Sequence, residues 1–194
     1  MNFLAHLHLS GDSDEIKIGN FIGDFVKGKE LEKYPEEIAR GIRLHRAIDS
    51  FTDHHSIVSE SKARLRDKYR HYSGVIVDVF YDHFLAANWS KYCDQPLDRY
   101  TKDSYDLIKS RLDELPDRIS NLIYYMSKGD WLYNYQYVEG IRRALTGMST
   151  RTRFESKMEQ AHIDLQDHYE SFADEFERFY PKLQQEARDF LSNN

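Results

Sequence analysis

Apolar residues recur at helical spacing along most of the chain, and the alternation typical of β-strands never persists beyond a few residues. The pattern predicts helices over residues 16–27, 35–55, 57–72, 73–89, 97–114, 117–128 and 131–148, and then two helices between 153 and 190 that separate near Pro181. The first nine residues are mostly apolar, and an extended backbone there would place His6 and His8 on one side. We expect an all-α helical bundle of about seven to nine helices, folded as a single domain over residues 1–194.

The segment 35–55, PEEIARGIRLHRAIDSFTDHH, carries a row of polar side chains beside its apolar face. At about 100° per residue, His45, Asp49 and Asp53 fall on one stripe, each a turn after the last. Leu44 and Ile48 belong to the neighbouring apolar stripe. Carboxylates and imidazoles at the border of a core are costly unless a cation binds them. This stripe is therefore predicted to form part of a metal site.

Two further helices place carboxylates among apolar residues. Asp24 lies between Gly23 and Phe25 in the segment 16–27. The segment SGVIVDVFYDHFLAANW is apolar nearly all round, which is typical of a buried helix, and it carries Asp78 and Asp82 one turn apart. Like charges at this spacing repel, and burial increases the cost. We expect either that one of these two carboxyls is protonated or that a cation lies between them.

Oxygen ligands with one or two imidazoles and no thiolate suit Mn²⁺, Mg²⁺ or Fe²⁺ better than structural zinc. Helical bundles build such sites from facing helices, and the chemistry they support includes metal-assisted phosphoester hydrolysis. Each residue also has an ordinary structural explanation. Asp24 could cap a backbone, Asp49 and Asp53 could pair with cations such as Arg46, and His45 could be an interior histidine. The metal prediction rests on the joint pattern.

Composition restricts the remaining function classes. The net charge of −6 argues against general nucleic-acid binding, which needs a dominant basic surface. Cys93 is the single cysteine, so an internal disulfide framework is excluded and a reducing compartment is expected. The first residues lack the basic region of a signal peptide, and no apolar run is long enough to span a bilayer. We expect a soluble, cytoplasmic protein without membrane contact.

Five segments resemble the acyl carrier protein phosphodiesterases: MNFLAHLHLS, GNFIGDFVKG, GIRLHRAIDSFTD, DVFYDHFLAANW and GMSTR. The resemblance implies an all-helical, divergent member of the HD-domain metal-dependent phosphohydrolases. It implies an enzyme of fatty acid and lipid metabolism that removes 4′-phosphopantetheine from holo-acyl carrier protein with Mn²⁺ or Mg²⁺. The adjacent His-Asp dipeptide of the HD signature is absent, and the reversed order occurs at Asp53-His54, Asp82-His83 and Asp167-His168. The ligands must therefore be chosen from the helical faces.

On this reading, a divalent ion binds the phosphodiester and a water, and the resulting hydroxide attacks phosphorus while the serine oxygen of the carrier leaves. His6 or His83 would protonate that oxygen. Asp24 and His45 are also assigned catalytic roles. The candidate metal ligands are Asp24, His45, Asp49, Asp53, Asp78 and Asp82.

Docking of an acidic carrier protein requires local positive potential on a chain that is acidic overall. Lys27, Arg43 and Arg46 are the candidates, because they lie close to the predicted ligands. Two alternatives stay open. An HD-type phosphohydrolase acting on nucleotides would release a nucleoside, and a non-catalytic helical interaction module would bind no metal.

Overall fold

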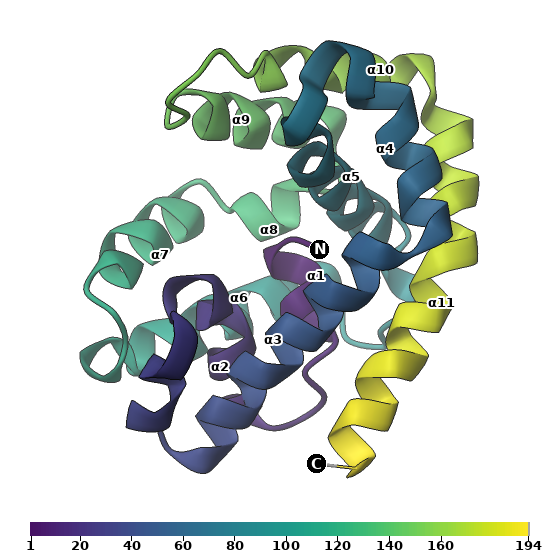
Figure 1. The fold of residues 1–194 in the computed structure, drawn as a ribbon. Helices are drawn as coiled ribbons and strands as arrows, with labels where there is room; N and C mark the ends of the chain where they lie inside the picture. The colour runs from purple at the N-terminus through teal and green to yellow at the C-terminus, as the bar shows by residue number, and fades with distance from the viewer. Residues whose placement is uncertain (194) are drawn as a thin grey trace.

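The computed structural model describes residues 1–193, and within them the chain forms eleven α-helices and no β-strand, so the predicted all-α class is confirmed (Figure 1). Eight of these helices have nine residues or more; the three short ones bring the total above the expected seven to nine. The helices are α1 (Phe3–His8), α2 (Asp14–Ile22), α3 (Glu36–His54), α4 (Ser56–Tyr69), α5 (Ser73–Ala87), α6 (Leu97–Ser110), α7 (Arg118–Lys128), α8 (Trp131–Asn134), α9 (Val138–Ser149), α10 (Ala161–Asp167) and α11 (Tyr169–Asn193).

Several predicted boundaries are wrong in an instructive way. The helix expected over 16–27 ends at Ile22, and Gly23–Phe25 forms a 3₁₀ turn that turns Asp24 outward. The helix expected over 131–148 is divided into α8 and α9. The break expected near Pro181 lies instead at His168, because Pro181 occupies an exposed position inside α11. A proline on the solvent side leaves its missing hydrogen bond to water, and the buried residues on either side hold the helix together.

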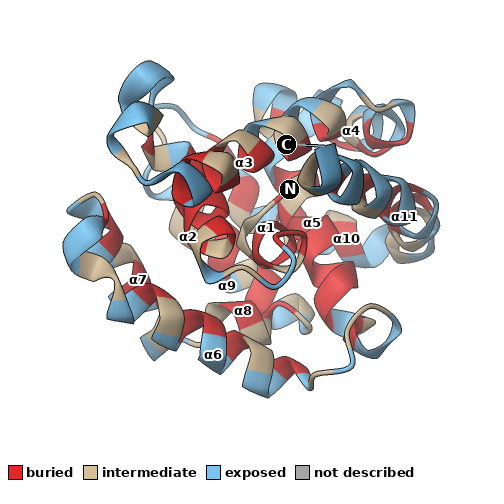
Figure 2. Cartoon of the chain, turned by 90° about the horizontal axis from the view of Figure 1, so that it is seen from below, coloured by how far each residue is buried: buried red, intermediate tan, exposed pale blue. Residues whose placement is uncertain are grey.

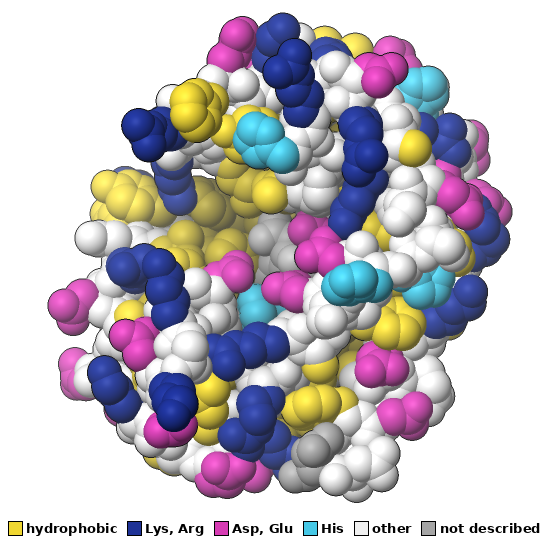
Figure 3. Space-filling model, viewed as in Figure 1, with side chains coloured by type: hydrophobic (Ala, Val, Ile, Leu, Met, Phe, Trp, Pro, Cys, Tyr) yellow, Lys and Arg dark blue, Asp and Glu magenta, His cyan; other side chains and the backbone are white. Residues whose placement is uncertain are grey.

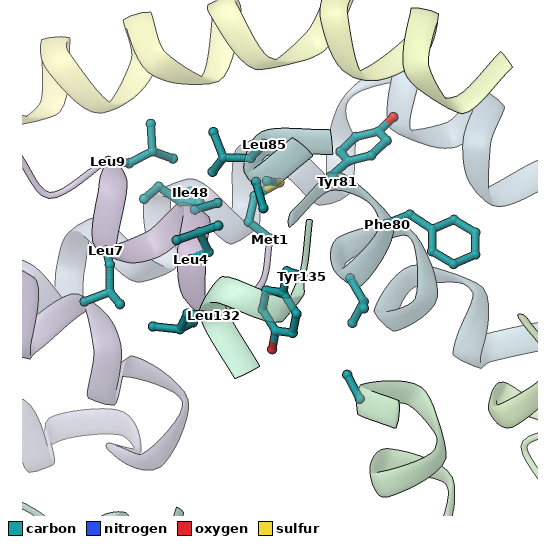
Figure 4. Packing of buried hydrophobic residues seen from close by; sticks show 14 of the residues in the cluster. Met1, Leu4, Leu7, Leu9, Ile48, Phe80, Tyr81, Leu85, Leu132 and Tyr135 are labelled. Carbon is teal, nitrogen blue, oxygen red and sulfur yellow. The ribbon is translucent and has the colours of Figure 1, made fainter. Parts of the chain in front are cut away.

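The N-terminal segment is helical, and α1 lies in the middle of the molecule (Figures 1 and 4). Leu4 and Leu7 are fully buried and belong to the single hydrophobic core that extends along the chain to Ala187. Two residues of helix correspond to roughly 200° of rotation, so the two histidines diverge. His6 faces α2 and α3, whereas the Nδ1 atom of His8 lies 2.7 Å from the Tyr180 hydroxyl in α11. The shared side that an extended segment would give is therefore absent.

α2 and α3 pack against each other with unusually close backbones. A Cβ atom on Gly19 would lie 2.0 Å from the carbonyl oxygen of Ile38, and one on Gly41 would lie 2.4 Å from that of Ile16. Only glycine fits at both positions, since real Cβ contacts are never this short. This contact sets the distance between the helix that carries Asn20 and the helix that carries His45.

The long helix α11 covers one side of the molecule, with exposed residues outside and buried ones inside (Figure 2). Its buried Glu175 accepts a hydrogen bond from Ser61 at 2.5 Å and pairs with Arg64, both in α4. A buried carboxylate is tolerated when it is paired in this way. Among residues 1–193, no helix combines the length and apolar content needed to cross a membrane.

Candidate metal centre

His6 from α1 and His45 and Asp49 from α3 converge on one point. The Nε2 atom of His6 lies 3.2 Å from Asp49 Oδ1, and that of His45 lies 3.1 Å from Asp49 Oδ2. The two imidazole rings are stacked with centroids 4.0 Å apart, and ligand atoms of all three residues lie within 4.8 Å of one another. Both histidines are buried, while the carboxylate is partly open to solvent. The arrangement provides two buried nitrogen donors and one carboxylate that solvent can reach.

Asn20 in α2 orients both rings. Its side-chain Nδ2 donates to the carbonyl oxygen of His6 and to Ser10, so its Oδ1 is the acceptor that faces His6 Nδ1 at 2.7 Å. Its backbone oxygen accepts from His45 Nδ1 at 2.8 Å. Both Nδ1 atoms therefore carry a proton, and both Nε2 atoms point at the same carboxylate. Metal-binding histidines are typically fixed by such a partner on the other ring nitrogen.

The buried His6 Nε2 atom lacks a hydrogen-bond partner among the described residues, which bears on whether a metal suits the site. The atom is fully buried and has no hydrogen-bond partner among the described residues, although the Asp49 carboxylate is close. With the ring proton on Nδ1, the lone pair of Nε2 faces a negatively charged oxygen. Two electron-rich atoms at this distance are stabilised by a cation between them. The donor set of His6, His45 and Asp49 fits a divalent ion.

The charges in the site are strongly coupled. Burial, reinforced by neighbouring His45, lowers the pKa of His6 to about 4, so this ring is neutral at pH 7. Burial alone would lower the pKa of His45, but hydrogen bonds to Asp24 and Asp49 raise it to about 9. Burial opposes ionisation of Asp49, yet the hydrogen bond from His45 and the nearby Met1 ammonium group hold its pKa well below the usual range. Without a metal, the site is an imidazolium held by carboxylates.

Asp24 reaches the same site from the 3₁₀ turn after α2. Its Oδ1 atom lies 3.3 Å from His45 Nε2, and its side chain is 70% exposed. The hydrogen bond from His45 lowers the pKa of this carboxyl. Gly23 makes the approach possible, because a Cβ atom there would lie 2.2 Å from the His45 ring. Asp24 is thus a charged group at the solvent side of the cluster.

The α-ammonium group of Met1 also lies at the cluster. It is 3.5 Å from Asp49 Oδ1 and 3.1 Å from Asp78 Oδ1. Burial alone would lower the pKa of this amine, but the two carboxylates raise it to about 10. The Met1 ammonium group therefore links Asp78 of α5 to Asp49 of α3.

The remaining predicted residues lie apart from the three-residue cluster. Asp82 accepts hydrogen bonds from the backbone N–H groups of Leu4 (2.8 Å) and Ala5 (3.2 Å) at the start of α1, and burial raises its pKa to about 7. Asp53 is exposed and pairs with Lys62 at 2.8 Å. His83 is buried with both ring nitrogens occupied, by the Tyr135 carbonyl oxygen at 2.8 Å and the Tyr169 hydroxyl at 3.0 Å. The structure thus unites Asp24, His45 and Asp49 with His6, and leaves Asp53 and His83 outside.

Two of the three candidate docking residues, Lys27 and Arg46, lie at the segment that follows Asp24. Arg46 donates to the carbonyl oxygens of Val26 (3.1 Å) and Gly28 (3.2 Å), which holds this turn against α3. Arg43 pairs with Glu36. Lys27 is exposed. Arg46 therefore has a structural task, whereas the ammonium group of Lys27 is accessible.

A sequence model described as acyl carrier protein phosphodiesterase matches residues 1–183. The chain belongs to the acyl carrier protein phosphodiesterase family. A family member from Klebsiella pneumoniae (strain 342) is 37% identical over 190 residues, which cover 97% of this chain and 98% of the relative. One from Enterobacter sp. (strain 638) is 34% identical over the same shares, and one from Escherichia coli O6:H1 is 34% identical over 96% of this chain and 97% of the relative. No solved structure matches the chain.

Two groups of this family member escaped the sequence reasoning as site components. Asn20 had a visible signal, since it is an amide close to Ile18, Phe21 and Ile22 in the apolar part of the helix, where an unpaired polar group would be costly. The Met1 amine had none, because its position depends on how α1 packs against α3 and α5.

Nuclear magnetic resonance titration of the metal-free protein is expected to give a His45 ring with a pKa of about 9 and a His6 ring with a pKa of about 4. A divalent ion at the cluster must displace the His45 proton, so affinity for Zn²⁺ or Mg²⁺ should rise about tenfold per pH unit up to that pKa and then level off. Saturating metal should abolish the His45 titration. Two rings that both titrate near 6.5 and ignore added metal would contradict the assignment.

Proposed function

We propose that this protein is a metal-dependent phosphodiesterase that hydrolyses the bond between 4′-phosphopantetheine and the serine of holo-acyl carrier protein, and thereby releases the apo protein. Membership of the family supports the substrate. The observation that carries the proposal is the meeting of His6, His45 and Asp49, whose Nε2 and carboxylate oxygen atoms face one another at 3.1–3.2 Å. A plain interaction module does not require two buried imidazoles that face one carboxylate.

His6, His45 and Asp49 would hold the ion, with Mn²⁺ or Mg²⁺ the metals that we propose. A bound divalent ion supplies a Lewis acid for phosphoryl oxygens and lowers the pKa of a water molecule. The residues of this chain provide the rest. Asn20 fixes both rings, which holds the donors in place before substrate arrives. Asp78 and Met1 form the neighbouring ion pair.

Asp24 is the group that we propose to handle the attacking water. Its carboxylate is exposed and lies at the open side of the cluster, and the hydrogen bond from His45 in the metal-free protein lowers its pKa further. It can orient a water toward phosphorus and accept its proton. The proton donor to the serine oxygen stays a prediction from the sequence, since the ring nitrogens of His83 are both engaged and those of His6 face Asn20 and Asp49.

Intact-mass analysis of purified holo-carrier protein tests this function. Incubation with this protein and Mn²⁺ should lower the carrier mass by one phosphopantetheine group, and free 4′-phosphopantetheine should appear in the supernatant. Exhaustive chelation should stop the reaction, and added Mn²⁺ should restore it. Full activity after chelation, an unchanged carrier mass, or a nucleoside product from nucleotides under the same conditions would reject the proposal.

We further propose that the surface around Lys27, with Arg43 and Arg46, receives the acidic carrier. Local positive potential raises capture of an acidic partner at low ionic strength. Lys27→Glu is expected to raise KM for the carrier several-fold at low salt and less at high salt, while Lys109→Glu, an exposed lysine on α6, serves as the control. A KM that responds equally to both variants would place docking elsewhere.

A further inference from the structure

A cleft with a volume of about 440 Å³ lies between the 3₁₀ turn Gly23–Phe25 and the helices α1, α7, α8 and α9. Apart from Arg118, Asn121 and Arg151, its lining residues are aromatic, aliphatic or glycine. This volume and this lining are typical of a small-molecule site. Figure 3 shows a hollow with hydrophobic side chains, beside which acidic and histidine side chains gather.

Two residues of the cleft lining are close in sequence to groups at the candidate metal centre. Phe25 lines the cleft and directly follows Asp24 in the 3₁₀ turn. Phe3 lines it as well and stands two positions from Met1, whose amine contacts Asp49. The ring of Phe3 also packs on Phe21 at 5.2 Å, which ties this wall to α2. A ligand with one end at the cluster can therefore extend into the cleft past Phe3 and Phe25.

We propose that this cleft binds the 4′-phosphopantetheine arm of the substrate. The inference rests on the proposed function. An arm whose phosphate lies at His6, His45 and Asp49 must extend away from the carrier, and its geminal methyl groups, methylene units and thiol end need an apolar surface. Its two amides need polar partners, and Asn121 is a side-chain amide in the lining.

The charges of the cleft fit the anionic end of this occupant. Arg118 and Arg151 line it, and within residues 1–193 neither forms an ion pair with a carboxylate. Arg118 also lines a neighbouring groove together with Phe25, the residue that follows Asp24. Guanidinium groups are suited to phosphate recognition, and free ones need no prior pairing to be broken.

Gly147 on α9 offers a direct test, because it lines the cleft and a Cβ atom there would have nothing within 4 Å. A larger side chain at this helical position fills the cleft without a backbone clash, and replacing glycine inside a helix does not cost helix stability. Gly147→Leu is expected to keep the wild-type melting temperature. It should raise KM for holo-carrier protein about tenfold or more, with Gly147→Ala in between.

Gly74→Leu is the matched control. Gly74 lies in α5, and the nearest contact of an added Cβ atom is the flexible Lys62 side chain at 3.6 Å. Calorimetry with pantetheine and metal-free protein gives a second readout: wild type and Gly74→Leu should bind it, and Gly147→Leu should not. If wild type leaves the carrier mass unchanged, the proposed function fails. If wild type cleaves the carrier and Gly147→Leu matches it in KM and pantetheine binding, only the cleft assignment is overturned.

Discussion

Asp49→Asn is expected to lower kcat/KM for holo-carrier protein at least about 100-fold and to weaken Mn²⁺ binding by a similar factor. The change keeps the shape of the side chain but removes the charge that faces His6 Nε2 at 3.2 Å and His45 Nε2 at 3.1 Å. Loss of groups that merely orient metal ligands costs about 10- to 100-fold, and loss of the ligand itself costs more. Steady-state kinetics and titration calorimetry with Mn²⁺ measure the two effects.

Asp53→Asn provides the control on the same helix, one turn later. Its carboxylate is 67% exposed and pairs with Lys62, so its replacement should leave both quantities near wild type. An Asp49→Asn protein that is as active as Asp53→Asn would remove the carboxylate from the centre and contradict the proposed chemistry.

Gly19→Ala is expected to reduce the free energy of unfolding by about 2–4 kcal/mol, because the added methyl group would lie 2.0 Å from the Ile38 carbonyl oxygen. For a chain of this size, the melting temperature should fall by roughly 10 °C. The helices must separate to relieve the clash, so the site between them should be disturbed and activity lost with the stability. Differential scanning calorimetry measures the first effect.

Gly74→Ala is the comparison for this prediction. The contact of its new methyl group with Lys62 at 3.6 Å is ordinary, and alanine favours helix over glycine. It should melt at or above the wild-type temperature. If Gly19→Ala melts together with Gly74→Ala, then the close approach of α2 and α3 is not a constraint on the fold.

The face of α3 shows how far helical periodicity extends as a guide to function. Four residues advance a helix by roughly 40° beyond a full turn, so Asp49 stays beside His45. Eight residues advance it by roughly 80°, and Asp53 turns toward Lys62 in α4. The stripe therefore identified two members of the centre, His45 and Asp49, correctly. Its third residue, Asp53, lies outside the centre because the rotation accumulates along the helix.

Contacts between distant helices could not be obtained in this way. The sequence indicated that Asp78 and Asp82 need a cation or a proton. In the structure Asp78 pairs with the Met1 ammonium group. Asp82 accepts hydrogen bonds from two backbone N–H groups of α1, and burial raises its pKa to about 7. Local pattern revealed the electrostatic demand, but only the packing of α1 onto α5 reveals what meets it.

Long helices pose the same difficulty on a larger scale. Proline is the strongest local helix breaker, yet α11 continues through Pro181 because the neighbouring Phe179, Tyr180 and Leu183 are fully buried. Conversely, nothing in the periodicity separates α10 from α11 at His168. Burial overrides propensity at Pro181, whereas the structure gives no comparable packing reason for the break at the exposed His168.

Asn20 accepts hydrogen bonds from two imidazoles: His6 donates to its side-chain oxygen, and His45 donates to its backbone oxygen. A substitution at position 20 would therefore remove the side-chain partner of His6 but leave the backbone partner of His45, because every residue has a carbonyl oxygen. The two rings can thus be altered separately: the partner of His6 depends on the side chain at position 20, whereas the partner of His45 depends only on the path of the α2 backbone.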